Sequence, residues 1–244
     1  MKFYYTYRET SPSTNQELKR MAKNGAPEGT VLVADHQTNG RGRLGKSFYS
    51  PKGNGVYFSL LLRPSLSAEY APLITVVAAV AVRRAIHTLF HIDTEIKWVN
   101  DLYFDGKKFC GILTESGFGK NGEMEYAVLG IGINLNAPDG GYPEEFAYKT
   151  TCLSNFVQEE IKKKTLIEEI LKEFDGCYQN LMQKAYLKEY KAASCVIGKE
   201  IEILSGPFSG RAVALDIDEE ANLICRLKNG EVVSLGTGDV SIHL

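Results

Sequence analysis

The sequence has few cysteines and lacks the long apolar run of a membrane-spanning segment. Its five cysteines are widely spaced and form no C-x-x-C pair, so the sequence indicates neither a disulfide framework nor a zinc site. The longest apolar stretch, residues 71–82, is shorter than the roughly 20 residues that a transmembrane helix requires. The first residues lack the apolar core and cleavage site of an export signal. These absences predict a cytoplasmic chain that is not inserted in a membrane.

The sequence also lacks a large excess of either charge. It has 28 lysines and arginines against 30 aspartates and glutamates, for a formal net charge of -2. This balance argues against a surface built throughout for nucleic acid, although it is compatible with a local basic site. The pair His87 and His91 lacks the glutamate that metalloprotease spacing requires, so no metal site is firmly assigned.

Hydrophobic periodicity and turn residues predict an α+β protein. From about residue 195 the pattern changes to short strands separated by Gly, Pro and Asn-Gly turns, which is typical of a small β-barrel. We therefore expect two domains, residues 1–193 and residues 194–244. Within the first, the expected strands are residues 3–7, 29–37, 54–64 and 125–136, and the expected helical segments are residues 15–23, 71–90 and 154–193.

A tight hairpin is predicted at Asp105 and Gly106, which separate two runs of strand-forming residues. If Phe104 faces Lys107, side-chain alternation gives this hairpin one core face and one face that gathers charge. The expected core face carries Trp98, Leu102, Phe109 and Leu113, and the opposite face carries Lys97, Asp101, Tyr103 and Lys108.

Residues 39–46, NGRGRLGK, spell G-x-G-x-x-G. A dinucleotide-binding turn would need a helix directly after the glycines and an acidic residue about 20 positions on. Loop and strand patterns follow instead, and no aspartate or glutamate occurs between Asp35 and Glu69. The glycines let backbone amides surround a phosphate, to which Arg41 and Arg43 can donate paired hydrogen bonds. The stretch predicts an anion site, although taken alone it fits an exposed basic connection equally well.

Five sequence blocks together resemble the biotin protein ligases in order and spacing. The blocks are STNQ from Ser13, QTNGRGR from Gln37, KWVNDLY from Lys97, KKFCGILTES from Lys107 and GIGINLN from Gly130. The resemblance covers about residues 1–190, and the terminal segment is similar to the small SH3-like domain of that family. It implies a class II synthetase-like catalytic domain, with a mixed sheet and helices, followed by an SH3-like β-barrel.

The resemblance implies a two-step reaction with biotin and ATP, the latter carrying Mg²⁺. Biotin is activated to biotinyl-5'-AMP, and the biotinyl group then passes to a lysine of the biotin carrier protein of a carboxylase. Because the first step develops negative charge at phosphorus, fixed cations suit it, and the resemblance assigns catalysis to Arg43 and Lys108. The residues that it assigns to binding are Ser13, Thr14, Asn15, Gln37, Gly40, Arg41, Gly42, Phe48, Lys97, Asp101, Gly111, Ile112, Gly130, Gly132 and Asn134.

Several of these residues have a plainer interpretation. Ser13 is equally suited to cap a helix, and Asn134 to occupy a turn. The glycines Gly130 and Gly132 predict room for a ligand or for another backbone. Phe48 stands where the family usually has tryptophan, so the aromatic wall is expected to be smaller.

Two other functions compete with biotin ligation. One is a lipoate or octanoate ligase of the same fold, and the other is a regulator that binds nucleic acid through the basic loop and the SH3-like tail. Because the chain begins almost at the catalytic blocks, we expect no N-terminal DNA-binding domain, no DNA or membrane partner, and an enzyme that only ligates. A homodimer is compatible with the sequence.

Overall fold

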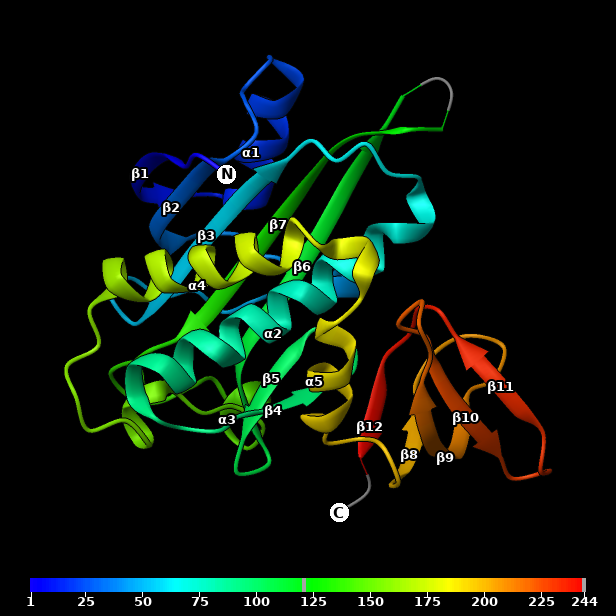
Figure 1. Cartoon of the computed structure of the whole chain (residues 1–244). Coiled ribbons are helices and arrows are strands. Elements are labelled where there is room, and N and C mark those ends of the chain that lie inside the picture. Colours follow the sequence, from blue (N-terminus) through cyan, green and yellow to red (C-terminus); the bar gives the residue numbers. More distant parts are fainter. Residues whose placement is uncertain (120–121, 243–244) are drawn as a thin grey trace.

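The computed structural model describes residues 1–119 and 122–242, which form two sheets of different size (Figure 1). The larger sheet has the strand order β1-β2-β3-β7-β6-β5-β4. β1 and β2 pair in parallel and the other neighbours pair antiparallel, so the sheet is mixed. Its strands are β1 Tyr4–Ser11, β2 Thr30–Gln37, β3 Gly55–Leu62, β4 Glu95–Lys97, β5 Asp101–Phe104, β6 Lys107–Phe118 and β7 Met124–Asn134.

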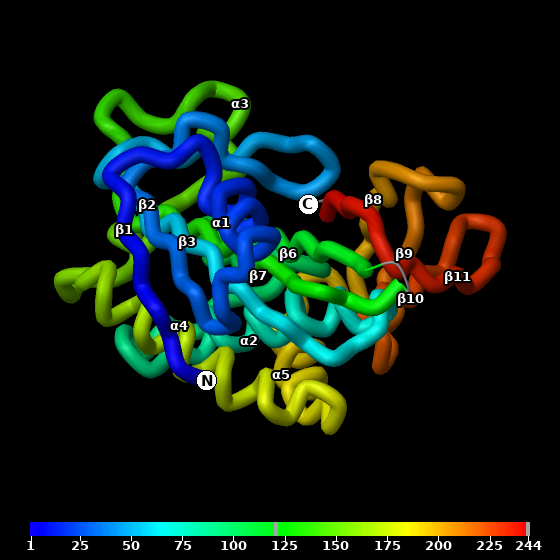
Figure 2. Tube along the Cα trace, turned by 90° about the horizontal axis from the view of Figure 1, so that it is seen from above, coloured from blue at the N-terminus to red at the C-terminus, as the bar shows by residue number. Residues whose placement is uncertain are grey.

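Helices cover both faces of the larger sheet (Figures 1 and 2). Helices α2 (Ala71–Phe90), α4 (Lys163–Tyr178) and α5 (Tyr186–Ala192) lie on one face, and α1 (Thr14–Lys23) lies on the other. α2 is long and apolar enough to cross a membrane by composition, but 72% of its most apolar window is buried inside the fold. It is apolar nearly all round because the sheet, α4 and α5 all pack against it.

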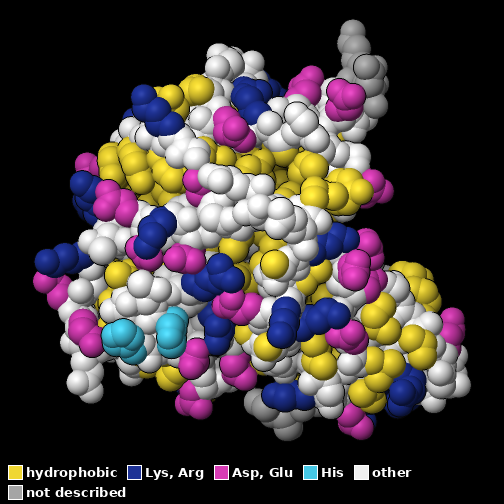
Figure 3. Space-filling model, in the orientation of Figure 1, with side chains coloured by type: hydrophobic (Ala, Val, Ile, Leu, Met, Phe, Trp, Pro, Cys, Tyr) yellow, Lys and Arg dark blue, Asp and Glu magenta, His cyan; other side chains and the backbone are white. Residues whose placement is uncertain are grey.

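Charged side chains of both signs are interspersed over the face that carries α2, α4 and α5 (Figure 3). This mixture agrees with the small net charge of the chain. α1 buries a smaller apolar cluster on the opposite face, where Leu18 packs with Leu32, Leu61 and Val128. That packing places the first turn of α1 at the level of the middle of β7.

The hairpin between β5 and β6 contains a bulge that changes the expected side-chain alternation. Tyr103 pairs with Lys108 as predicted, but the register shifts before Leu102, which pairs with Cys110. Phe109 is therefore the extra residue, and the consecutive side chains of Phe109 and Cys110 are both fully buried. The prediction that Leu113 lies on the core face is wrong, because the bulge turns it toward the cavity described below.

The expected helical segment from residue 154 to residue 193 is interrupted. α4 begins only at Lys163, and after it ends a short 3₁₀ turn closes on Lys184, whose positive φ of 55° ends the turn before α5. Ile161 and Leu181, which the uninterrupted segment would place in one helix, lie outside α4. A short helix, α3 (Glu144–Ala147), lies between β7 and α4 and was not predicted.

The second sheet is antiparallel, with the order β11-β10-β9-β8-β12. It is joined to the larger sheet by the indole N–H of Trp98, which donates to the carbonyl oxygen of Ala221 at 2.9 Å. Cys195 and Ile96 also share a backbone hydrogen bond. The predicted boundary between residues 193 and 194 stays a prediction. The strands are β8 Glu200–Ile203, β9 Gly210–Ile217, β10 Leu223–Leu227, β11 Val232–Leu235 and β12 Val240–Ile242.

Candidate active site

A cavity of about 720 Å³ opens where four parts of the chain meet. These are the larger sheet, α1, the second sheet and residues 39–46, here called the glycine-rich loop. Most of the predicted site residues line the cavity, although they come from segments far apart in the sequence. Those lining it are Ser13, Thr14, Asn15, Gln37, Arg41, Gly42, Arg43, Phe48, Lys97, Asp101, Lys108, Gly111, Ile112, Gly130 and Gly132.

Two predicted site residues, Gly40 and Asn134, lie outside the lining of this cavity. A Cβ atom on Gly40 would meet the carbonyl oxygen of Phe48 at 2.3 Å, so this glycine permits the base of the loop to close. The buried amide of Asn134 donates to the carbonyl oxygen of Thr151 at 3.1 Å. Both residues support the walls of the site, and their contact with a ligand stays a prediction.

A polar network forms the end of the cavity next to α1. Gln37 Oε1 accepts hydrogen bonds from the backbone N–H and the hydroxyl of Thr14, at 2.9 and 3.1 Å. The fully buried hydroxyl of Ser59 contacts Thr14 Oγ1 at 2.8 Å and Asn15 Oδ1 at 2.6 Å. Ser13 occupies the N-cap position, but its side chain makes no capping hydrogen bond with the described residues. Polar groups for an uncharged ligand are thus ordered in advance.

The glycines of β6 and β7 make room for side chains. A Cβ atom on Gly130 would lie 2.2 Å from Asn15 Oδ1, and one on Gly132 would lie 2.5 Å from the ring of Phe48. A Cβ atom on Gly111 would lie 3.0 Å from the same ring. Asn15 and the Phe48 ring therefore fill the space next to these glycines, and the contact of Gly130 and Gly132 with a ligand stays a prediction.

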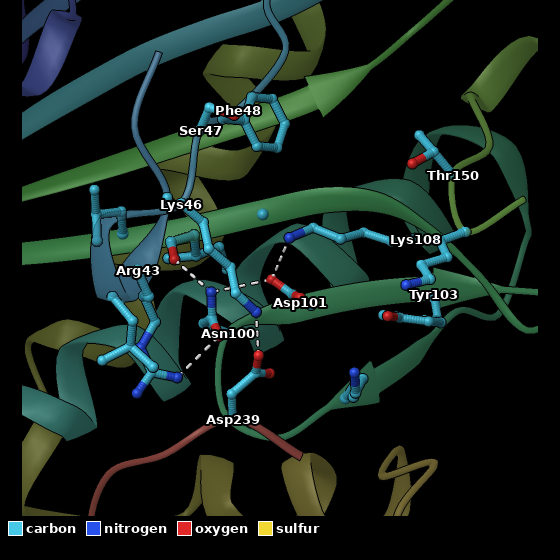
Figure 4. Close-up of a pocket in the computed structure, with 18 of the residues that line it drawn as sticks. Arg43, Lys46, Ser47, Phe48, Asn100, Asp101, Tyr103, Lys108, Thr150 and Asp239 are labelled. Carbon is cyan, nitrogen blue, oxygen red and sulfur yellow. Dashed lines mark hydrogen bonds and ion pairs between the residues drawn. The ribbon is translucent and has the colours of Figure 1, made fainter. Parts of the chain in front are cut away.

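The glycine-rich loop is a compact turn in the ligand-free chain. The backbone N–H of Gly42 donates to the carbonyl oxygen of Lys46 at 2.7 Å. Leu44 and Gly45 between them adopt positive φ angles of 53° and 76°. This geometry directs Arg43 across the cavity, where its Nη1 donates to Asn100 Oδ1 at 3.1 Å (Figure 4). Burial lowers the pKa of the Arg43 guanidinium, but an arginine remains protonated at neutral pH.

Lys108 enters the cavity from β6 on the opposite side (Figure 4). Its Nζ donates to Asp101 Oδ1 at 2.7 Å and lies 5.8 Å from the centre of the Phe48 ring. Lys97 lies further along, with its Nζ 5.5 Å from the centre of the Tyr103 ring. Burial lowers the pKa of Lys97, and the carboxylates Asp101 and Asp239 partly oppose this effect.

The second sheet completes the site with residues that the sequence interpretation missed. Thr237 Oγ1 accepts a hydrogen bond from Arg43 Nη2 at 3.3 Å. Asp239 forms an ion pair with Lys46 (Figure 4). Asn100 and Ser59 were also missed as site residues. Asn100 lies inside the KWVND block and was therefore within reach of the resemblance, whereas Ser59 is hidden in an apolar strand pattern.

The charge of the cavity suits an anionic ligand. Among residues 1–119 and 122–242, no group of three or more His, Cys, Asp or Glu side chains is placed to hold a metal ion. Cationic side chains outnumber acidic ones along the walls. The cationic residues are Arg41, Arg43, Lys46, Lys97, Lys108, Lys149 and Lys199, and the acidic residues are Glu95, Asp101, Glu145 and Asp239.

Known proteins are similar to this chain in sequence and in architecture. The sequence model of the biotin/lipoate A/B protein ligase family matches residues 6–134. The bifunctional ligase/repressor BirA of Bacillus subtilis is 37% identical over 229 residues, covering 92% of this chain and 70% of that protein. The biotin–[acetyl-CoA-carboxylase] ligase of Mycobacterium tuberculosis is 30% identical over 248 residues, covering 95% and 86%. The structure of the Aquifex aeolicus biotin protein ligase in complex with biotin and ATP matches with a TM-score of 0.81, at 26% identity and 98% coverage of both chains.

Proposed function

The chain belongs to the biotin/lipoate A/B protein ligase family, and we propose that it is an ATP-dependent biotin protein ligase. The observation that carries this function is the convergence of Arg43 and Lys108 on one cavity whose far end is uncharged and polar. Such a cavity suits a molecule with an uncharged hydrogen-bonding head and a carboxylate that must meet a phosphate. Biotin and ATP meet this description together.

In the first step, a carboxylate oxygen of biotin attacks the α-phosphorus of ATP. The bond from that phosphorus to the bridging oxygen breaks, and its electron pair leaves with pyrophosphate. Arg43 and Lys108 stabilise the negative charge that develops on the phosphoryl oxygens, which is the main help that a protein gives to this reaction. Asp101, 2.7 Å from the Lys108 ammonium, keeps that cation in place until the phosphate arrives.

In the second step, the amine of a carrier-protein lysine attacks the acyl carbon of biotinyl-5'-AMP. The bond from that carbon to the phosphate oxygen breaks, AMP leaves, and the new amide nitrogen loses a proton. The acceptor is the biotin carrier protein of acetyl-CoA carboxylase or of a related carboxylase, as the name of the M. tuberculosis relative supports.

Thr14, Asn15 and Gln37 bind the ureido head of biotin. A buried ureido group without partners would cost about 1–3 kcal/mol, so ordered donors and acceptors at this end favour binding. Phe48 forms an aromatic wall, and Gly111 and Ile112 also line the cavity. Mg²⁺ enters with ATP, because phosphates and one or two carboxylates are its usual ligands.

We further propose where the enzyme works and how its chain divides into domains. The enzyme works in the cytoplasm, and residues 1–193 form its catalytic domain while residues 194–244 form the SH3-like domain. It binds neither DNA nor membranes. A homodimer is compatible with these assignments.

The test is ATP–pyrophosphate exchange by the purified protein with biotin, lipoate or octanoate as the sole acid. Exchange with biotin alone establishes both the activation step and the substrate. Exchange with only lipoate or octanoate would keep the adenylation chemistry and overturn the assignment of biotin. A protein that is folded by circular dichroism and exchanges with none of the three acids would refute the enzymatic function.

A further inference from the structure

The side chain of Asn100 contacts groups on both sides of the cavity. It lies in the turn between β4 and β5, and its Oδ1 accepts the hydrogen bond from Arg43 Nη1 at 3.1 Å. Its Nδ2 donates to Asp101 Oδ1 at 3.0 Å and to the carbonyl oxygen of Ile112 at 2.8 Å. The backbone of Asn100 accepts a further hydrogen bond from the Ile112 N–H at 2.9 Å. β6 therefore anchors this residue through both its main chain and its side chain.

The neighbours of Asn100 require an amide at this position. One end of the side chain faces a guanidinium donor, and the other end faces a carboxylate and a carbonyl, which both accept. Only an amide offers an acceptor to one side and two donors to the other in so small a group. The same pattern of partners fixes which end of the amide is oxygen.

Asn100 joins two cations that come from unconnected parts of the chain. Arg43 belongs to the loop between β2 and β3, and Lys108 belongs to β6. Hydrogen bonds run from Arg43 to Asn100, from Asn100 to Asp101, and from Lys108 to the same Asp101 oxygen (Figure 4). Arg43 extends from a loop whose next residue, Leu44, is 61% exposed, so little apolar packing holds the loop.

We propose that Asn100 is a positioning residue that holds the Arg43 guanidinium and the Asp101–Lys108 pair at a fixed separation before ATP binds. The two cations then meet the α-phosphate without reorganisation, which is where a fixed charge contributes most to rate. Asn100 acts through Arg43 and Asp101, and no contact with substrate is assigned to it. This proposal rests on the adenylation reaction proposed above.

A double-mutant cycle tests the proposal through catalysis. N100A should lower kcat for biotin-dependent ATP–pyrophosphate exchange about tenfold or more, as expected when a hydrogen bond to a charged group is lost. The KM for biotin should stay within about twofold, because the ureido-binding end is unchanged. In an R43A background the same substitution should lower kcat by a smaller factor than in the wild type, since one of the two groups that Asn100 positions is absent. An equal loss with and without Arg43 would overturn the proposal.

Hydrogen exchange of the ligand-free protein tests it without catalysis. Amides of residues 39–47 should exchange faster in N100A and in R43A than in the wild type. In the double variant they should exchange no faster than in either single variant. Unchanged protection of this loop in N100A would overturn the proposal. T237V is the matched control because it removes the other side-chain partner of Arg43, a longer and exposed hydrogen bond at 3.3 Å. Its effect should be smaller than that of N100A, and an equal or larger effect would also overturn the proposal.

N100D is a second variant of nearly the same volume, which keeps the test usable if N100A does not fold. It still offers an acceptor to Arg43, so protection of residues 39–47 should stay near that of the wild type. It loses both donations and repels Asp101, so exchange activity should still fall; loss of loop protection in a folded N100D would overturn the proposal. If the wild type exchanges with none of the three acids, the proposed ligase function fails, and the hydrogen-exchange comparison still decides whether Asn100 holds Arg43.

Discussion

At the residue scale, the cations of the site differ in what balances them before any ligand arrives. Lys108 is paired with Asp101, and Lys46 is paired with Asp239. Arg43 is half-buried and instead donates to two neutral side chains. Its charge therefore gains a direct anionic partner when a phosphate approaches.

Arg43→Ala should weaken retention of the reaction intermediate. We expect biotinyl-adenylate to dissociate about 10- to 100-fold faster, because a charge-assisted contact with the phosphoryl group is lost. Release of radiolabelled adenylate after gel filtration measures this rate. Arg20→Ala, at an exposed arginine of α1 outside the cavity, is the control. An Arg43→Ala enzyme that forms and retains adenylate like the wild type would show that its assigned role is wrong.

The lowered pKa of Lys97 predicts how the exchange rate falls at alkaline pH. Because burial lowers its pKa, its positive charge is lost at a lower pH than that of an exposed lysine as the pH rises. If Lys97 binds phosphate, the alkaline limb of the exchange rate should move to higher pH in Lys97→Arg, since arginine stays protonated. Lys23→Arg, at an exposed residue of α1, should leave the limb in place. Identical limbs for wild type and Lys97→Arg would exclude this role.

At the element scale, local patterns predicted most strands of the larger sheet, and failed where a bulge interrupts the alternation. The hairpin at Asp105 and Gly106 is confirmed, because both residues adopt positive φ angles, 49° and 69°. The prediction that Leu113 lies on the core face of the hairpin was wrong, because nothing in the sequence marks Phe109 as an extra residue. The helical segment expected over residues 154–193 was likewise wrong at Lys184, where the backbone turns left-handed.

The same limit applies to the site. The motif blocks predicted the residues on the loop, α1 and the hairpin, which the cavity brings together. The contribution of Thr237 and Asp239 depends on how the second sheet docks, and no local pattern encodes that. The α+β fold with a mixed sheet and a second SH3-like sheet is confirmed by the architecture and by the A. aeolicus structure.

Close packing between β7 and the loop predicts a strong effect of one added methyl group. Gly132→Ala would place Cβ 2.5 Å from the Phe48 ring, so the ring must move away from β7. We expect biotin-dependent exchange to fall about tenfold or more because the displaced ring no longer positions the substrate, and the folded state to lose the roughly 1–3 kcal/mol that overpacking costs. Gly176→Ala in α4 has open space around it and should raise Tm, because alanine favours a helix over glycine. Wild-type exchange kinetics in Gly132→Ala would contradict this packing argument.

At the scale of the whole molecule, the two sheets are linked by a buried hydrogen bond and by exposed ion pairs. The Trp98 indole donates to the carbonyl of Ala221 between buried residues, and Lys191 pairs with Asp216 on the surface at 3.1 Å. Buried polar groups are costly to leave unpaired, whereas exposed ion pairs contribute little. Trp98 therefore sets how firmly the second sheet holds its part of the cavity.

Trp98→Phe should lower the free energy of unfolding by about 1–3 kcal/mol, because the Ala221 carbonyl loses its donor. Urea denaturation followed by circular dichroism measures this change, and we expect the transition to broaden as the two sheets separate. Asp216→Asn should change stability by less than about 1 kcal/mol. Equal stabilities of wild type and Trp98→Phe would show that docking does not depend on this contact.

The walls of the cavity begin at Ser13 and end at Ile242. During synthesis, β1 to β3 emerge early, but β7 must insert beside β3 before the larger sheet is continuous, and β12 must emerge before Lys46 meets Asp239. A growing chain therefore completes its binding site only after its last strand has emerged. A shortened nascent chain that lacks β12 thus has no complete site with which to capture biotin or ATP.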